Sequence, residues 1–196
     1  MLPEEIRQSL TEPQKRDLLQ LARDAIAAYA AGSLLPAAEL PELSLVHAGV
    51  FVSLHIDEQL RGCIGCVENV RSLPEALRET AISAASRDPR FAPLSAAELE
   101  QVEIEISVLS PLRKVTSPTE ITLGRHGVMV KLGYHQGLLL PQVALHHDWE
   151  VETFLTHVCQ KAGLSAEAWK DPEAGIYIFE AEVFSENELR RDNLIE

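Results

Sequence analysis

The residues with the clearest chemical potential lie in one short stretch, residues 60–65, which reads LRGCIG. It combines a thiol, a cation and two glycines directly after a strand-like segment. Cysteine reacts as its thiolate, and a nearby arginine such as Arg61 stabilises that form. Gly62 and Gly65 lack a Cβ, which permits a bulge or the close approach of a ligand or another backbone segment. The stretch therefore predicts a presented Cys63, although an interior strand cysteine with glycines for tight packing has the same composition.

A second thiol three residues later gives this stretch the spacing of a metal-binding or redox pair, Cys63 and Cys66. A structural zinc site needs a second pair of ligands, and Cys159 is assigned to a helix core by its neighbours. A thioredoxin-like pair lies at the start of a helix, whereas residues 67–71 separate this pair from the next helix start. The sequence therefore favours a single working cysteine, and we expect no metal and no cofactor.

The segment Gly124-Arg125-His126-Gly127 is the second place where polar side chains stand between glycines. It is no phosphate loop, because the Gly-Lys-Ser/Thr ending is missing. It predicts either an exposed Arg125 and His126 or a simple turn with Arg125 in a surface ion pair.

A third polar segment, Asp88-Pro89-Arg90-Phe91, follows a predicted helix. Prolines at 89 and 93 end the helix, because proline removes an amide donor and restricts the residue before it. The segment is expected to be a stiff loop in which Asp88 pairs with Arg90 or Arg87. Its functional interpretation is a brace for the cysteine stretch.

The elements that position these residues can be predicted from the hydrophobic periodicity. A helix begins near Thr11 and ends at Gly32, and a half-buried strand covers 46–56. A tight return at 57–59 makes the cysteine stretch the second arm of an antiparallel hairpin. Further elements are a helix from the capping box at Ser72, a second capping box at 95–98 and a strand over 102–108.

The second half of the chain is richer in glycine and predicts a second small sheet. Strands are expected over 128–132 and 138–140, joined by 133–137. Asp148 is a plausible N-cap for a helix with Cys159 on its inner face. One strand over 176–184 and a charged tail complete the pattern.

Composition and charge restrict the classes of function. The 196 residues are 46% hydrophobic with three cysteines, which is typical of a globular protein without a disulfide framework. The net charge is −13, with nine basic and nine acidic residues between 61 and 131, so the flanks carry the excess. Nucleic acid is therefore an unlikely partner. With no leader pattern and no long apolar run, we expect a cytoplasmic protein without a membrane segment.

Five motifs occur in an order and spacing that resemble the AMMECR domain family. They are LRGCIG at 60–65, DPRF at 88–91, ISVLSP at 106–111, GRHG at 124–127 and GLLLPQVA at 137–144. The resemblance implies an α+β fold: an antiparallel sheet flanked by helices, a smaller β-rich subdomain and a cleft between them. Within one domain over 1–196, we expect a larger subdomain from about 1–115 plus 175–196 and a smaller one from about 116–174. The sequence departs from the family pattern at Cys66, where a small or hydroxyl residue is usual.

The resemblance also implies partners, a Memo-like protein and a radical-SAM protein of the AmmeMemoRadiSam system, but no reaction. We predict one cleft in which Cys63 is the nucleophile and His126 its base. Binding of a substrate or anion is assigned to Arg61, Gly62, Gly65, Arg90 and Arg125, with support from Asp88 and Gln142. The alternatives are a binding or adaptor module for an anionic ligand or peptide end, and a CxxC redox or metal site. Turnover and capture both stay open, since the difference depends on the distance from Cys63 to His126 and on the thiol's reactivity.

Overall fold

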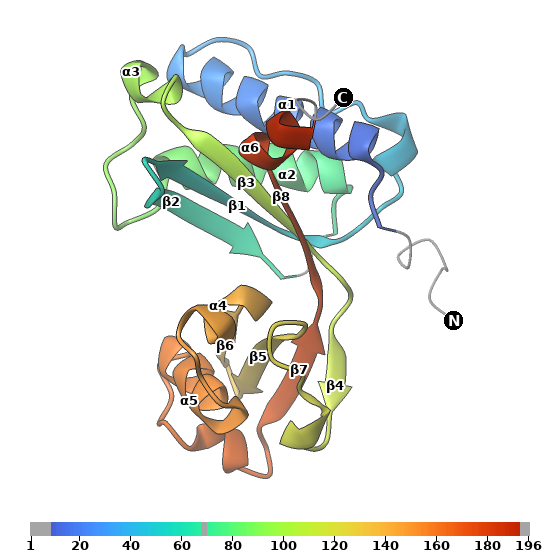
Figure 1. The fold of residues 1–196 in the computed structure, drawn as a ribbon, viewed down its shortest axis with the longest axis vertical. Coiled ribbons are helices and arrows are strands. Elements are labelled where there is room, and N and C mark those ends of the chain that lie inside the picture. The colour runs from blue at the N-terminus through green and yellow to red at the C-terminus, as the bar shows by residue number, and fades with distance from the viewer. Residues whose placement is uncertain (1–8, 68–69, 193–196) are drawn as a thin grey trace. The chain divides into compact units, whose positions relative to one another are not determined.

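The computed structural model describes residues 9–67 and 70–192, which form two compact units (Figure 1). Unit 1 comprises residues 1–109 and 182–196, and unit 2 comprises 110–181. Each unit contains one four-stranded sheet, with the strand orders β2-β1-β3-β8 and β4-β7-β5-β6. The fold is α+β with two sheets, as predicted. In the described part of the chain no helix is long and apolar enough to cross a membrane.

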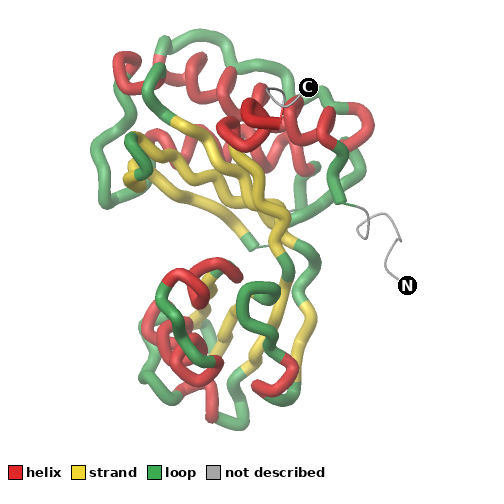
Figure 2. Tube along the Cα trace, viewed as in Figure 1, coloured by secondary structure: helices red, strands yellow, loops and turns green. Residues whose placement is uncertain are grey.

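In unit 1, helices α1 (Glu12–Ala30) and α2 (Leu73–Ser86) lie on one face of the sheet, as Figures 1 and 2 show. The sheet contains β1 (Gly49–Ile56), β2 (Gln59–Cys66), β3 (Glu103–Leu109) and β8 (Ala181–Ser185). Alternate residues of β1 point to the helices, and the side chains of Val50, Val52 and Leu54 are fully buried there. Because side chains alternate along a strand, the intervening residues face away from this core.

Both predicted capping boxes are present. Ser72 caps α2 together with Glu75, and Ser95 caps the short α3 (Ala96–Leu99) together with Glu98. The hairpin return is also confirmed, and it is tighter than expected. Asp57 and Glu58 both have positive φ, 50° and 62°, as a two-residue turn of type I′ requires.

Unit 2 contains β4 (Arg113–Val115), β5 (Gly127–Leu132), β6 (His135–Leu139) and β7 (Gly175–Phe179). Its helices are α4 (Pro141–His146) and α5 (Val151–Lys161). A separate core forms between α5 and the sheet, where Phe154, Leu155, Val158 and Cys159 are fully buried. The assignment of Cys159 to a helix core is confirmed.

Two predictions about the second half of the chain are wrong. Residues 176–184 form two strands in different sheets, because the chain leaves unit 2 after β7 and joins the sheet of unit 1 as β8. The N-cap of α5 is Glu150, and Asp148 lies in the preceding turn with φ of 52°. The charged tail contains α6 (Glu186–Asp192), which packs against α1 and β3 through the buried Leu189; residues 193–196 lie outside the described part.

Candidate functional site

A β-bulge determines where Cys63 points. Near the turn, Ile56 pairs with Gln59 and His55 with Leu60, but beyond the irregularity Leu54 pairs with Gly62 and Ser53 with Cys63. Arg61 is therefore the extra residue of the bulge. Because one inserted residue reverses the alternation, Cys63 shares the face of Ser53 and turns away from the helices.

Cys63 is half-buried and lies beside a buried hydroxyl on this helix-free face. The Ser53 hydroxyl donates to Cys63 Sγ over 3.4 Å, and Ser53 is only 8% exposed. On its other side Ser53 pairs with Glu105 of β3. One residue from each of three strands thus forms a polar row across the sheet.

A buried carboxylate, Asp88, fixes the backbone of the cysteine. Asp88 Oδ2 accepts the backbone amide of Cys63 at 2.9 Å and Arg90 Nη2 at 2.7 Å, while Oδ1 accepts Arg90 Nε at 3.0 Å. These donors, above all the Arg90 guanidinium, hold the pKa of Asp88 far below its usual range. The predicted pair of Asp88 with Arg90 is present, and it connects the loop after α2 to the outer edge of β2.

Arg90 is the cation whose charge interacts with Cys63 in this arrangement. Its bond to Asp88 raises the pKa of Arg90 most, and the negative charge of a Cys63 thiolate acts in the same direction. The Arg90 side chain is 55% exposed, whereas that of Asp88 is 2% exposed. A ligand can therefore reach the guanidinium while the carboxylate that orients it stays inside the protein.

Arg61, the other arginine predicted at this site, is held by an acidic residue. Its Nε lies 2.8 Å from Glu98 Oε1, and this bond, with help from the Ser95 cap, lowers the pKa of Glu98 to about 2. The ring of Phe91 lies within cation–π distance of both guanidinium groups, 5.8 Å from Arg61 and 5.3 Å from Arg90. A direct role of Arg61 at the thiol stays a prediction.

The two glycines of the motif serve close packing on opposite faces of β2. A Cβ on Gly62 would lie 2.4 Å from the carbonyl oxygen of Ala84 in α2. A Cβ on Gly65 would lie 2.2 Å from the ring of Phe51, which covers this glycine beside the cysteine. Gly62 therefore lets the helix approach the sheet, and Gly65 makes room for an aromatic neighbour of Cys63.

The strand geometry separates the two thiols of the CxxC pair. Cys63 pairs with Ser53 and Cys66 with Val50, so their side chains lie on opposite faces of β2. Three residues of extended strand also place their Cα atoms roughly 10 Å apart, beyond the reach of a disulfide. Cys63 and Cys66 cannot act together on one metal ion or form a disulfide in this fold.

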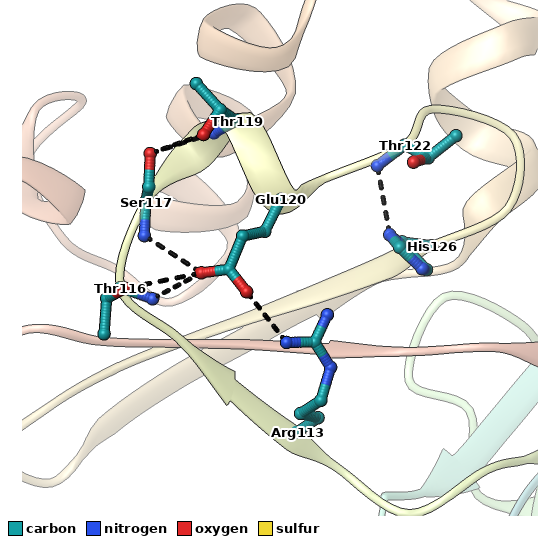
Figure 3. A network of polar contacts seen from close by, with 7 residues as sticks. All are labelled: Arg113, Thr116, Ser117, Thr119, Glu120, Thr122 and His126. Carbon is teal, nitrogen blue, oxygen red and sulfur yellow. Dashed lines mark hydrogen bonds and ion pairs between the residues drawn. The ribbon is translucent and has the colours of Figure 1, made fainter.

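His126 belongs to unit 2, where it closes a turn (Figure 3). Its Nδ1 accepts the backbone amide of Thr122 at 3.0 Å, and its own amide donates to the Thr122 carbonyl at 2.9 Å. Burial, followed by the charge of Arg125, lowers the pKa of His126 and so favours the neutral ring. Because Nδ1 accepts the Thr122 amide, the proton of the neutral ring is on Nε2. The predicted role as a base would require the bond to Thr122 to break.

The other predicted residues of unit 2 are exposed. Arg125 forms a surface ion pair with Glu180, Nη2 to Oε1 at 2.8 Å, with side chains 67% and 51% exposed. Gln142 is exposed in the first turn of α4. The neighbouring segment is held by Glu120, which accepts from Arg113 and from the Thr116 amide, and these contacts lower its pKa to about 2 (Figure 3).

The structure therefore brings together the predicted residues of unit 1, namely Arg61, Gly62, Cys63, Gly65, Asp88 and Arg90. It groups Arg125 and His126 in unit 2, and the pairing of Cys63 with His126 stays a prediction. Sequence reasoning missed Ser53 and Glu105. Both lie at polar positions of alternating strands, so the sequence predicted that they face away from the core. The bulge that brings Cys63 to the same face could not be located from the sequence, where Gly62 was its only indication.

Comparisons with known proteins agree with the five motifs. The AMMECR1 family model matches residues 19–184. Protein MJ0810 of Methanocaldococcus jannaschii is 43% identical over 180 residues, 88% of this chain and 90% of its own. Protein MK0488 of Methanopyrus kandleri is 44% identical over 191 residues, 92% of each. The crystal structure of uncharacterized protein PH0010 from Pyrococcus horikoshii matches with a TM-score of 0.81 and 37% identity, over 87% of this chain and 90% of that one. The chain belongs to the AMMECR1 family.

Proposed function

We propose that the helix-free face of unit 1 handles an anionic substrate or partner group, with Cys63 as the reacting or contacting thiol and Arg90 as the anion-binding cation. The observation that carries this proposal is the use of the buried Asp88. It accepts the Cys63 amide and, through the same carboxylate, binds the exposed Arg90, whose pKa a Cys63 thiolate would raise through its charge.

The proposal gives each residue a part in binding. Arg90 offers a fixed guanidinium to a carboxylate or phosphate. Ser53 donates a hydrogen bond to the sulfur. Bond formation at Cys63 distinguishes this function from simple capture.

The proposal also covers partners and location. The family resemblance supports a Memo-like protein and a radical-SAM protein as the partners of this site, which a pull-down with the purified proteins can test. None of Cys63, Cys66 and Cys159 is in a disulfide. Free thiols are typical of a reducing compartment, and we propose that the protein is cytoplasmic.

The decisive experiment compares two alkylating reagents of different charge. Anionic iodoacetate and neutral iodoacetamide are reacted in limiting amounts at neutral pH, and each cysteine is quantified by peptide mass mapping. Cys63 is expected to react at least about tenfold faster than Cys159 with either reagent, since Cys159 is fully buried and burial raises the pKa of its thiol. The ratio of iodoacetate to iodoacetamide rates at Cys63 is expected to exceed that of glutathione.

Variants separate the roles within this experiment. Arg90→Gln is expected to lower the anion preference to that of glutathione, whereas Arg87→Gln, at an exposed arginine in the same loop, leaves it unchanged. Cys66→Ser is expected to be silent, because Cys66 faces the other side of the strand. An anion ratio at Cys63 no higher than that of glutathione, or equal labelling of Cys63 and Cys159, would contradict the proposal.

A further inference from the structure

The polar row across the sheet of unit 1 includes a carboxylate, Glu105, that has no role in the proposed function. Cys63 and Glu105 lie on either side of Ser53, each as its direct partner in the antiparallel ladder. Directly opposed residues have Cβ atoms about 4.5–5.5 Å apart on the same face. A buried hydroxyl therefore stands between a thiol and a carboxylate.

The direction of the Ser53 hydrogen bond suits a relay. Its hydroxyl proton points to Cys63 Sγ. A hydroxyl has one donor proton and two acceptor lone pairs, so with its proton on the sulfur Ser53 can still accept from a protonated carboxyl on its other side. This is the arrangement that follows transfer of a proton from the thiol to Glu105.

The surroundings of Glu105 differ from those of Asp88. The described residues provide no arginine or lysine in an ion pair with Glu105, whereas Arg90 binds Asp88 in bidentate fashion. Three titratable groups act through their charge on the pKa of Glu105: His55 on β1, Glu103 on its own strand and Glu188 on α6. Burial raises the pKa of Glu105 most, Glu188 and Glu103 add to this, and His55 opposes it. Such a carboxylate takes up a proton more readily than an ordinary glutamate.

We propose that Glu105 is the terminal acceptor of the proton that Cys63 loses when it reacts, and that the Ser53 hydroxyl carries this proton. In the step, the S–H bond breaks as a new O–H bond forms on Ser53, and the original Ser53 proton moves to a Glu105 carboxylate oxygen. The sulfur keeps the electron pair and attacks the electrophile. This inference rests on the proposed function and gives the cysteine a proton acceptor within its own sheet.

The relay predicts a particular dependence on pH. The form with thiol and carboxylate and the form with thiolate and carboxylic acid carry the same number of protons, so their ratio does not change with pH. Wild-type protein therefore keeps a reactive thiolate population over a range of pH. Without an internal acceptor, the thiolate fraction falls about tenfold per pH unit on the acidic side.

The test is the pH profile of Cys63 alkylation by neutral iodoacetamide in the full-length protein. Wild type, Glu105→Gln, Ser53→Ala and the control Glu103→Gln are compared after circular dichroism has verified the fold. Glu103 lies two residues from Glu105 on the same face and pairs with His55, so the control removes a charge near the row and leaves its three residues in place. Its contribution to the raised pKa of Glu105 is the smallest of the causes. The readout is the rate at about pH 6 relative to the alkaline plateau, which a purely structural role would not move.

We expect this relative rate to fall at least about tenfold in Glu105→Gln and in Ser53→Ala, and to stay within about twofold of wild type in Glu103→Gln. An unchanged or higher relative rate in Glu105→Gln would overturn the inference. A loss in Glu105→Gln with none in Ser53→Ala would overturn the route through the hydroxyl. Because the reagent is neutral, the anion preference attributed to Arg90 is measured separately, so failure of the proposed function is distinguishable from failure of the relay.

Discussion

Each unit pairs an arginine with an acidic residue, but the acidic residue is buried in unit 1 and exposed or half-exposed in unit 2. In unit 1 a buried carboxylate, Asp88, binds both the backbone amide of Cys63 and the guanidinium of Arg90. In unit 2 the acidic partners Glu120 and Glu180 are exposed or half-exposed, and they bind Arg113 and Arg125 at the surface. Burying a charge costs free energy unless it is fully hydrogen-bonded, so the Asp88 arrangement demands precise partners. The comparison shows why the motif cysteine, rather than the GRHG turn, is the stronger candidate for chemistry.

Removing one carboxylate from each unit, Asp88 or Glu120, tests this difference most directly. Asp88→Ala is expected to lower the free energy of unfolding of unit 1 by about 3 kcal/mol, because several charge-assisted hydrogen bonds are lost and the Cys63 amide loses its acceptor. Glu120→Ala is expected to have a smaller effect, since water replaces its contacts. Urea unfolding measures both, and hydrogen exchange at the Cys63 amide is expected to accelerate only in Asp88→Ala. Equal losses in the two variants would remove the distinction between the units.

The stabilisation by Asp88 is also expected to depend on pH. Its pKa is depressed in the folded protein, so its stabilisation is present above the unfolded pKa and is lost as the pH falls towards the folded value. The stability difference between wild type and Asp88→Asn is therefore expected to be constant above about pH 5 and to shrink below about pH 4. Urea unfolding at a series of pH values measures this difference. A difference that persists unchanged in acid would show that Asp88 stabilises through its shape and not its charge.

The smallest effect is expected at the exposed pair of unit 2. Arg125→Ala is expected to change the free energy of unfolding by about 0.5 kcal/mol or less, because exposed ion pairs contribute little. The measurement is again urea unfolding, with Glu180→Ala as the matched control for the same pair. A loss of several kcal/mol would mean that the turn depends on Arg125.

Hydrophobic periodicity was sufficient where an element buries one face over its whole length. It predicted α1, α2, β1, β3 and the inner face of α5 with Cys159. It failed at residues 176–184, because alternation is the same whichever sheet a strand joins. Between β7 and β8, Glu180 forms two hydrogen bonds with Ser110. The Glu180 amide donates to Ser110 Oγ at 2.9 Å, and the Glu180 carbonyl accepts the Ser110 amide.

The sequence by itself determined the family, the two sheets, the hairpin and the presence of a cysteine between glycines. Only the tertiary structure decided which way that cysteine faces. An unbroken hairpin from the turn at 57–58 would pair Cys63 with Val52 and point the thiol into the helix-covered core, but the bulge at Arg61 pairs it with Ser53. The tight contact of Gly62 with α2 and the bond from the Cys63 amide to Asp88 both come from residues more than twenty positions away. A local pattern cannot specify such contacts, because one residue of register reverses every side chain on a strand.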